Sequence, residues 1–366
     1  MAFSTISLSR GIFSDEASGD AESRYVASDM IRFHRGRPQI LGGWQAATSD
    51  LVPGVARQII QWADTDGREY AAIGTHKRVQ ILFGGELTDI TPLESSGTLG
   101  SSPITTASGS TTITIADTSH GLEVDQEVLL ASATAVGGLT AAQLNAYHTV
   151  LTTPDANTYS VVVSGAAASS TATGGGTPTY SYLIPPGFAE STGGTGWGGG
   201  TWNQSGTTFG TARTVAATTF NLRNWSFALY GEDLLMVASD HQTLYKFDTS
   251  AGVLSRGAAV SNAPACEQVL VNADTRQVLA FGGTDRMQIA FSEKNDITDW
   301  TSTQTNSAGS VSLGEGSEII AVSKARGAGN FLVVTDQSAY LMTFIGGELV
   351  YRFSRVGGTP APLGPS

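Results

Sequence analysis

A unit of three short strand-forming runs, separated by tight turns, recurs four times along the chain and constrains the fold more than any other feature. In the first unit the runs are Gln58–Ala63, Glu69–Gly74 and Arg78–Phe83, and the Asp-Gly pair in the first turn is typical of a hairpin. The other three units have the same order of runs, at residues 225–247, 267–292 and 318–344. The repeat predicts a series of antiparallel sheets.

The spacing of the units indicates a propeller. Their central runs begin near residues 70, 234, 278 and 331, and the last two intervals match the period of roughly 40–50 residues of propeller blades. Because propellers have roughly 4–8 blades, four units either form a complete ring or need further blades from another chain or a processed fragment. The sequence leaves both alternatives open.

The first interval is too long by about 120 residues, which predicts an inserted domain between the first and second blades. Residues 98–212 contain no Lys or Arg, and this change in composition marks a separate unit. Thr111–Ala116 and Thr158–Val163 are among its predicted strands, and Thr140–Asn145 predicts one short helical turn. A small β-barrel or sandwich fits this pattern.

The predicted fold class is therefore all-β, with propeller-like repeats, complete or incomplete, and an inserted small β-barrel or sandwich domain. Glycine contributes 44 of 366 residues and charged residues only 14%, which favours strands and turns over long solvated helices. The predicted parts are an N-terminal segment with the first blade at 1–97, the inserted domain at 98–180, a Gly/Trp-rich loop at 181–222, further blades at 223–356 and a C-terminal coil at 357–366.

The net formal charge of −12 argues against a dedicated nucleic-acid binder, which needs a basic face. An acidic wall would instead let DNA pass without adsorbing to it. The single cysteine, Cys266, excludes an intrachain disulfide, and we interpret it as a buried structural residue. The sequence contains no run of 18 apolar residues, so no membrane-spanning helix is predicted. The N-terminus lacks the pattern of a signal peptide, so we expect synthesis in the cytoplasm.

No pattern typical of a catalytic, cofactor or metal site is present, so we expect a protein that is not an enzyme and carries no cofactor. There is no Gly-x-Ser-x-Gly elbow, and the five histidines form no His-x-His or His-x-x-x-His pair. Asp64–Gly67 begins like a calcium loop but lacks the later ligands, so a hairpin turn is predicted there. Gly194–Gly199 matches a dinucleotide fingerprint in its letters only, because no strand precedes it.

Two clusters are candidate partner contacts. Arg32, Arg35 and Arg37 are the one basic concentration and would suit an acidic partner, the alternative being an ordinary solvated strand face. Trp197 and Trp202 lie in a glycine-rich stretch that cannot form regular helix. Since two indoles must still bury their area, we expect this stretch to dock on a partner or on the chain's own propeller.

Short motifs resemble virion proteins of tailed bacteriophages. Gly36–Trp44 resembles a "Gly-x-Pro-x-x-x-Gly-Gly-Trp" segment that precedes their propeller blades, and Ser292–Trp300 is similar to their "Ser-x-x-Asn-x-x-x-Asp-Trp" blade ending. His120–Leu122, Ala135–Gly138 and Asp155–Tyr159 resemble a small β-barrel module that recurs in phage tail proteins. That module is related in pattern to the catalytic-cysteine half-domain barrel of ubiquitin-activating enzymes, but here it carries no catalytic cysteine.

The resemblance implies a structural protein of the virion tail, a nozzle or hub subunit of the head-to-tail connector. Several copies would form a ring, six-fold in symmetry, on the tail axis next to the portal, the adaptor or other tail proteins. DNA would be ejected through the lumen without sequence-specific binding, and the arginine cluster would contact the adaptor. The alternative is a receptor-binding or tailspike-associated protein that binds carbohydrate through Trp197 and Trp202. A glycan-cleaving enzyme built on the propeller is a third option.

Overall fold

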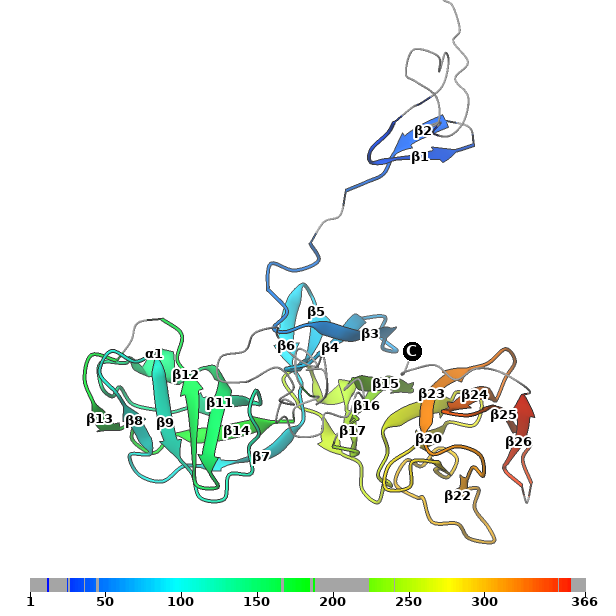
Figure 1. The fold of residues 1–366 in the computed structure, drawn as a ribbon. Helices are drawn as coiled ribbons and strands as arrows, with labels where there is room; N and C mark the ends of the chain where they lie inside the picture. The colour runs from blue at the N-terminus through cyan, green and yellow to red at the C-terminus, as the bar shows by residue number, and fades with distance from the viewer. Residues whose placement is uncertain are drawn as a thin grey trace, which may run out of the picture. The chain divides into compact units, whose positions relative to one another are not determined.

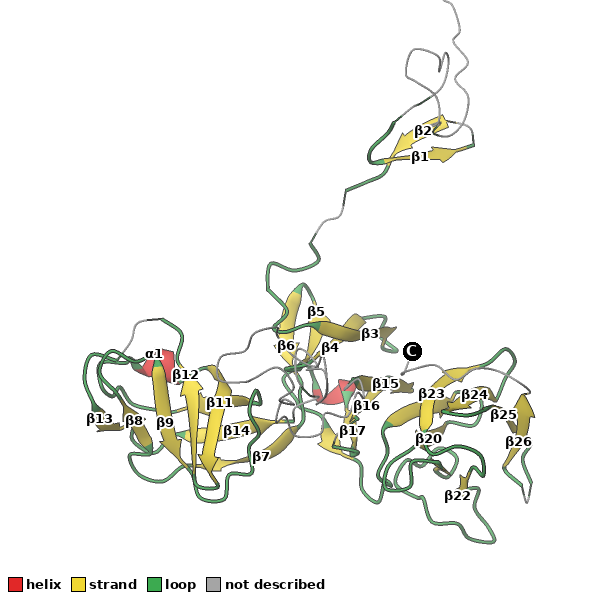
Figure 2. Ribbon diagram, viewed as in Figure 1, coloured by secondary structure: helices red, strands yellow, loops and turns green. Residues whose placement is uncertain are grey.

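The computed structural model describes residues 12, 25, 27–35, 37–43, 46–165, 168–184, 187, 224–239, 241–347 and 349–356. The chain divides into two compact units, Met1–Ser49 and Asp50–Ser366. Strands dominate the described residues, which include one α-helix, α1 (Ala141–Leu144), and one 3-10 helix, η1 (Thr249–Ala251) (Figures 1 and 2). The predicted all-β class is confirmed.

The first unit contains a hairpin of β1 (Ile31–His34) and β2 (Arg37–Ile40). The ring of Phe33 packs edge-on against the ring of Tyr25, with 5.3 Å between centroids. The strand-turn-strand pattern predicted in this part of the sequence is therefore present over 31–40.

Four four-stranded antiparallel meanders account for the repeat, and we call them blades A to D. Their strands are, for blade A, β3 (Ala56–Ala63), β4 (Glu69–Thr75), β5 (Val79–Phe83) and β6 (Glu86–Asp89); for blade B, β15 (Trp225–Tyr230), β16 (Asp233–Ala238), β17 (Leu244–Phe247) and β18 (Ala258–Ala259); for blade C, β19 (Gln268–Asn272), β20 (Gln277–Phe281), β21 (Gln288–Phe291) and β22 (Gly309–Ser312); and for blade D, β23 (Ile319–Lys324), β24 (Asn330–Thr335), β25 (Ala339–Phe344) and β26 (Tyr351–Val356).

The fourth strand of each blade was not predicted from the sequence. In blades B and C the fourth strand consists of small residues that follow a long connection, without the alternation that indicates a half-buried strand. These strands form because the third strand offers unpaired backbone N–H and C=O groups along its outer edge. Tertiary proximity, rather than local sequence preference, places them.

Consecutive blades pack face to face, with their first strands adjacent: β3 beside β15, β15 beside β19 and β19 beside β23. Each pair of blades encloses an apolar core. The buried side chains of these cores include Ala72, Trp225 and Met236 between blades A and B; Val237, Val269 and Ala280 between blades B and C; and Phe281, Ile289, Phe331 and Val333 between blades C and D. Since second-strand residues alternate between two cores, the inner blades are buried on both faces.

A polar contact accompanies the apolar packing at every blade junction. The Trp225 indole N–H donates to the carbonyl of Thr75 in blade A at 3.0 Å. The backbone N–H of Val269 donates to the Ser226 hydroxyl at 3.0 Å, and the Gln268 amide donates to the carbonyl of Ile320 at 3.0 Å. These contacts fix the register between blades, which hydrophobic packing alone does not specify.

The inserted module follows blade A and precedes blade B in the sequence and forms one curled eight-stranded sheet, in the order β13-β8-β9-β12-β11-β10-β14-β7 (Figure 1). Its strands are β7 (Leu93–Thr98), β8 (Ile104–Thr106), β9 (Thr112–Ala116), β10 (Glu127–Ala131), β11 (Tyr147–Asp155), β12 (Thr158–Val162), β13 (Ala172–Gly174) and β14 (Thr179–Leu183). The sheet encloses its own core, which includes Ile113, Leu130 and Tyr159. It extends beyond the predicted limits of 98–180 at both ends.

The motifs that carry the family resemblance have structural roles in this fold. Gly137 and Gly138 have φ of 56° and 85°, and a Cβ at either would meet Thr106 or Ser169. In blade C, Asn295 has φ of 59°, a conformation that asparagine tolerates, and the Trp300 indole donates to the carbonyl of Ile297 at 2.7 Å. Both motifs therefore shape turns within the sheets.

Candidate interaction surfaces

The three arginines of the predicted basic cluster lie on the β1–β2 hairpin and are exposed. Arg32 lies opposite Gln39 and His34 lies opposite Arg37, so strand alternation brings Arg32 and Arg37 to one face. Arg35 occupies the turn, with φ of 49°. The structure thus gathers two of the arginines on one face, with the third at its end. Their contact with a partner stays a prediction.

Trp197 and Trp202 lie outside the described residues, as does Gly194–Gly199. The role predicted for the two tryptophans in docking to a neighbour therefore stays a prediction.

The candidate catalytic and metal positions that the structure describes have structural partners. The Asp64 carboxylate accepts the backbone N–H of Arg68 at 2.8 Å, its Nε at 2.6 Å and the Tyr70 hydroxyl at 3.2 Å, which confirms the predicted hairpin turn. Cys266 is buried, and burial raises the pKa of its thiol to about 12. Among the described residues no group of three or more His, Cys, Asp or Glu side chains is arranged to hold a metal ion.

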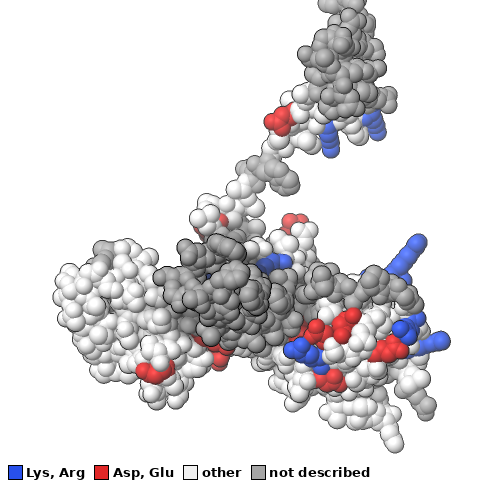
Figure 3. Space-filling model, viewed as in Figure 1, with Lys and Arg blue, Asp and Glu red and all other residues white. Residues whose placement is uncertain are grey.

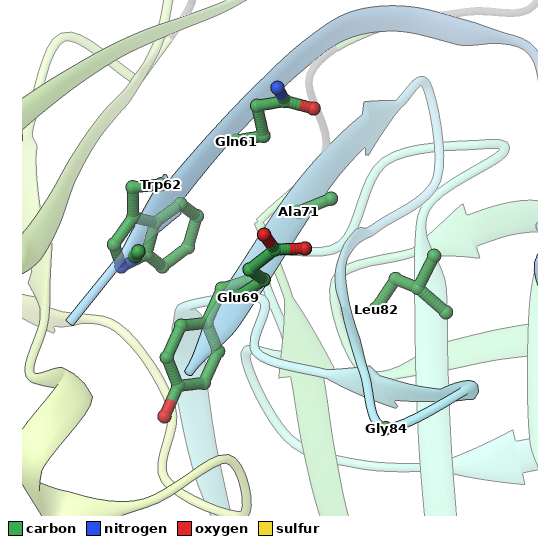
Figure 4. Close-up of a pocket in the computed structure, with 8 residues that line it drawn as sticks. Gln61, Trp62, Glu69, Ala71, Leu82 and Gly84 are labelled. Atoms are coloured by element: carbon green, nitrogen blue, oxygen red, sulfur yellow. The ribbon is translucent and has the colours of Figure 1, made fainter. Parts of the chain in front are cut away.

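A hollow of about 410 Å³ lies on the outer face of blade A, the face turned away from blade B (Figure 4). The strand register places Gln61, Ala71 and Leu82 in one row across β3, β4 and β5, along the floor of the hollow. Glu69 stands at its rim, while the Trp62 side chain turns into the core between blades A and B. Glu69 is the one carboxylate among the residues that line the hollow, whereas acid–base catalysis of glycoside cleavage needs a pair of such groups.

The inserted module is held on blade A by a buried charged contact. Glu127, at the start of β10, is 4% exposed and accepts Arg78 Nε at 2.9 Å and Lys77 Nζ at 3.2 Å. The Thr149 hydroxyl donates to the same carboxylate at 2.6 Å. Burial raises the pKa of Glu127, but the charges of Arg78 and Lys77 and these hydrogen bonds outweigh it, so its pKa lies below the usual value. The carboxylate is therefore ionised, and two cations, Arg78 and Lys77, balance its charge.

A second polar cluster extends this contact to blade B. The Arg78 guanidinium stacks over the Tyr147 ring at 3.4 Å, and the Tyr147 hydroxyl donates to Asp89 at 2.6 Å. Arg256, just before β18, reaches the same carboxylate at 2.8 Å. Burial and the Asp89 charge raise the pKa of Tyr147 to about 12. We call the two clusters together the junction network; it ties the module to two blades.

Sequence analysis missed the junction network, although one signal for it exists. Glu127 opens an otherwise apolar strand in a part of the chain, 98–212, that contains no Lys or Arg. A buried carboxylate needs a cation or several hydrogen bonds, so the cation that compensates Glu127 had to come from outside the module. Which cation supplies the charge depends on the fold.

In the part of the chain that the structure describes, no helix is both long and apolar enough to cross a lipid bilayer. Comparison with known proteins identifies no relatives by sequence: no family model matches the chain, and no curated protein matches it. Among solved structures the chain is similar to phage phi92 endosialidase, with a TM-score of 0.27 and 15% identity over 84% of this chain and 47% of that one. The chain thus spans about half the length of that protein, and a likeness this weak carries no argument about function.

Proposed function

We propose that the chain is a structural, non-enzymatic component of a phage tail: a nozzle or hub subunit that forms a ring on the tail axis. The observation that carries the proposal is the open series of four blades to which the junction network fixes an inserted β-module. An all-β subunit whose end blades keep partly exposed outer faces is suited to assembly. The motifs at Ala135–Gly138 and Ser292–Trp300 support the family, because each shapes a turn of the part in which the resemblance expects it.

The charge distribution suits a wall that DNA passes. The net charge is −12, and the face of the inserted module visible in Figure 3 carries no basic side chain. Binding of DNA requires cations that displace its condensed counterions, so such a surface does not retain DNA by charge. A conduit needs this property, since a genome that adsorbed to the wall could not slide.

The basic face of the β1–β2 hairpin is the contact we propose for the adaptor or portal. Arg32 and Arg37 lie on that face, with Arg35 in the turn beside them. Exposed guanidinium groups form bidentate contacts with carboxylates, so an acidic rim on the neighbouring ring would orient the subunit.

Cryo-EM of the intact particle tests the location. Ring-shaped density for this subunit on the tail axis below the portal, six-fold in symmetry, is the expected result. Three-fold or peripheral density would overturn the conduit and favour the carbohydrate-binding alternative. In that case glycan-array binding by the wild-type chain, and its loss in Trp197→Ala and Trp202→Ala, would follow.

The proposed lack of enzymatic activity on glycans has its own test. The purified chain, incubated with capsular and lipopolysaccharide fractions of the host, should release no oligosaccharide fragments over the buffer control. Release of fragments would overturn the non-enzymatic part of the proposal.

A further inference from the structure

The outer faces of the two end blades are half-covered, unlike every inner face. On blade A the row Ile59, Ile73 and Gln80 runs beside the row Gln61, Ala71, Leu82 and Leu87. Ile59 is 67% exposed. On blade D the row Leu332, Leu341 and Ser354 runs beside the row Val334, Ala339 and Val356. Apolar side chains predominate in the rows of both end faces, and partly exposed apolar surface of this kind is often buried against a partner.

The two end faces are the two complementary halves of the interface that repeats inside the chain. In blades B, C and D, one face of the second strand packs on the preceding blade, as Met236, Val278 and Val333 do. For the equivalent face of blade A, with Ala71 and Ile73, the described residues form no preceding blade.

The opposite face of the second strand packs on the following blade in blades A, B and C, as Ala72, Val237 and Phe281 do. For the equivalent face of blade D, with Leu332 and Val334, the part of the chain that the structure describes contains no following blade. Blade D thus presents the half of the interface that blade A lacks, and blade A the half that blade D lacks.

The charges at the rims of the two faces are opposite. Glu69 begins β4 and is exposed on the outer face of blade A, at the end of the blade that carries the β3–β4 turn. Arg352 is the second residue of β26 and is exposed on the outer face of blade D, opposite Thr343. It lies at the corresponding end of its blade, which carries the β23–β24 turn. Face-to-face packing of the two blades would bring unlike charges to the same rim.

We infer that the outer face of blade A docks on the outer face of blade D of a second copy of this chain, in the manner of consecutive blades. A second copy supplies both halves of this contact, because each chain carries the two complementary faces with opposite rim charges. Such a contact is head-to-tail, so successive copies close into a ring if the rotation between them divides a full turn. The inference deepens the oligomeric part of the proposed function.

Charge substitutions on each face test the contact in the purified full chain. Ile59→Arg adds a cation to the apolar rows of the blade A face. The double variant Arg352→Glu, Val356→Glu adds anions to the blade D face, one of them at the rim that would meet Glu69. All three side chains are already exposed, Val356 by 40%, so the subunit should fold normally. Sedimentation equilibrium should show an oligomer for the wild type and association weakened by at least about tenfold in either variant.

Leu254→Arg is the matched control. Leu254 is 88% exposed in blade B and lies on neither end face, so this variant should assemble as the wild type does. If Leu254→Arg weakened assembly as much as Ile59→Arg, general charge repulsion rather than the blade contact would be responsible, and the inference would be overturned.

Mixing the two face variants distinguishes a head-to-tail contact from a symmetric one. Ile59→Arg retains an intact blade D face, and the Arg352→Glu, Val356→Glu variant retains an intact blade A face. Each should associate less than the wild type when alone, and the mixture should associate, because the intact blade D face of one variant meets the intact blade A face of the other. Failure of the mixture to associate, or a wild-type chain that is monomeric up to its solubility limit, would overturn the inference.

The outcome is independent of where the protein lies in the virion. A monomeric purified chain with on-axis density in the particle would overturn only this contact, leaving the end faces to another occupant. Assembly through these faces with peripheral density would overturn only the conduit.

Discussion

Arg78 and Glu127 lie 49 positions apart, yet Nε and Nη2 of the guanidinium both donate to one carboxylate oxygen, at 2.9 and 2.5 Å. Arg78 directly precedes β5 of blade A, and Glu127 is the first residue of β10 in the module. The contact joins two sheets, each of which has a separate apolar core. The orientation of the module therefore depends on charge and hydrogen bonding rather than on a continuous core.

Glu127→Gln should lower the free energy of unfolding by about 3 kcal/mol, because Arg78 and Lys77 then face the junction without a counter-charge. This value is at the lower end for a broken buried pair, since Lys77 is 30% exposed and keeps some contact with water. Urea denaturation measures the change. Glu123→Gln, an exposed acid of the same module, should change stability by less than about 0.5 kcal/mol. Equal losses in the two variants would contradict the role given to Glu127.

The junction should weaken in acid. The pKa of Glu127 is below its usual value in the folded chain, and it is about 4.3 in an unfolded chain. A carboxyl group whose pKa is lower in the folded chain stabilises the fold fully at pH values above its pKa in the unfolded chain. This contribution is lost as the pH falls through the pKa of the folded chain. The stability difference between wild type and Glu127→Gln should therefore be constant near neutral pH and shrink toward pH 3. A difference that did not depend on pH would contradict an ionised Glu127.

Gly137→Ala should destabilise the module more than Gly109→Ala. Both glycines have positive φ, 56° and 78°, so both alanines incur a conformational cost of about 1–2 kcal/mol. At Gly137 the new Cβ also meets the Thr106 side chain and the carbonyl of Ser170, whereas nothing lies within 4 Å at Gly109. Thermal unfolding of the two variants measures the difference. Equal decreases in melting temperature in the two variants would show that the backbone around Gly137 moves and makes room for the Cβ.

Cys266 should resist thiol reagents in the native chain and react once the chain unfolds. The side chain is buried among blades B and C, and burial raises the pKa of the thiol to about 12, so almost no thiolate exists at neutral pH. The rate of reaction with a disulfide reagent, measured with and without guanidinium chloride, checks this. Fast labelling under native conditions would place Cys266 in a region that opens readily.

The double variant Arg35→Glu, Arg37→Glu should block attachment of the subunit to the neighbouring ring without unfolding it. Both side chains are exposed, so stability should change by less than about 0.5 kcal/mol. Arg276→Glu, Lys294→Glu makes the same charge change at two exposed positions of the inner blade C, and it serves as the control. Assembly into particles is the readout. Normal attachment of the Arg35, Arg37 variant would remove the hairpin from the proposed adaptor contact.

Local sequence was sufficient to predict the blades and the inserted module. Alternating β-branched residues and turn residues such as Asp66-Gly67 act within a few positions, so the first three strands of every blade and the helical turn at α1 lie where the sequence indicates. The same is true of the β1–β2 hairpin. In the blades and in the hairpin the partner strand is the next one along the chain.

The tertiary structure alone decided what depends on distant partners. The outer strands β18 and β22 have no strand signal of their own and exist because an edge was free. The carboxylate of Glu127 found its cations in a blade about fifty positions earlier in the chain, since a buried charge takes whatever counter-charge the fold brings near. That the end faces of blades A and D stay half-covered also follows only from how the sheets stack, because alternation within a strand is the same whether or not a neighbouring blade is present.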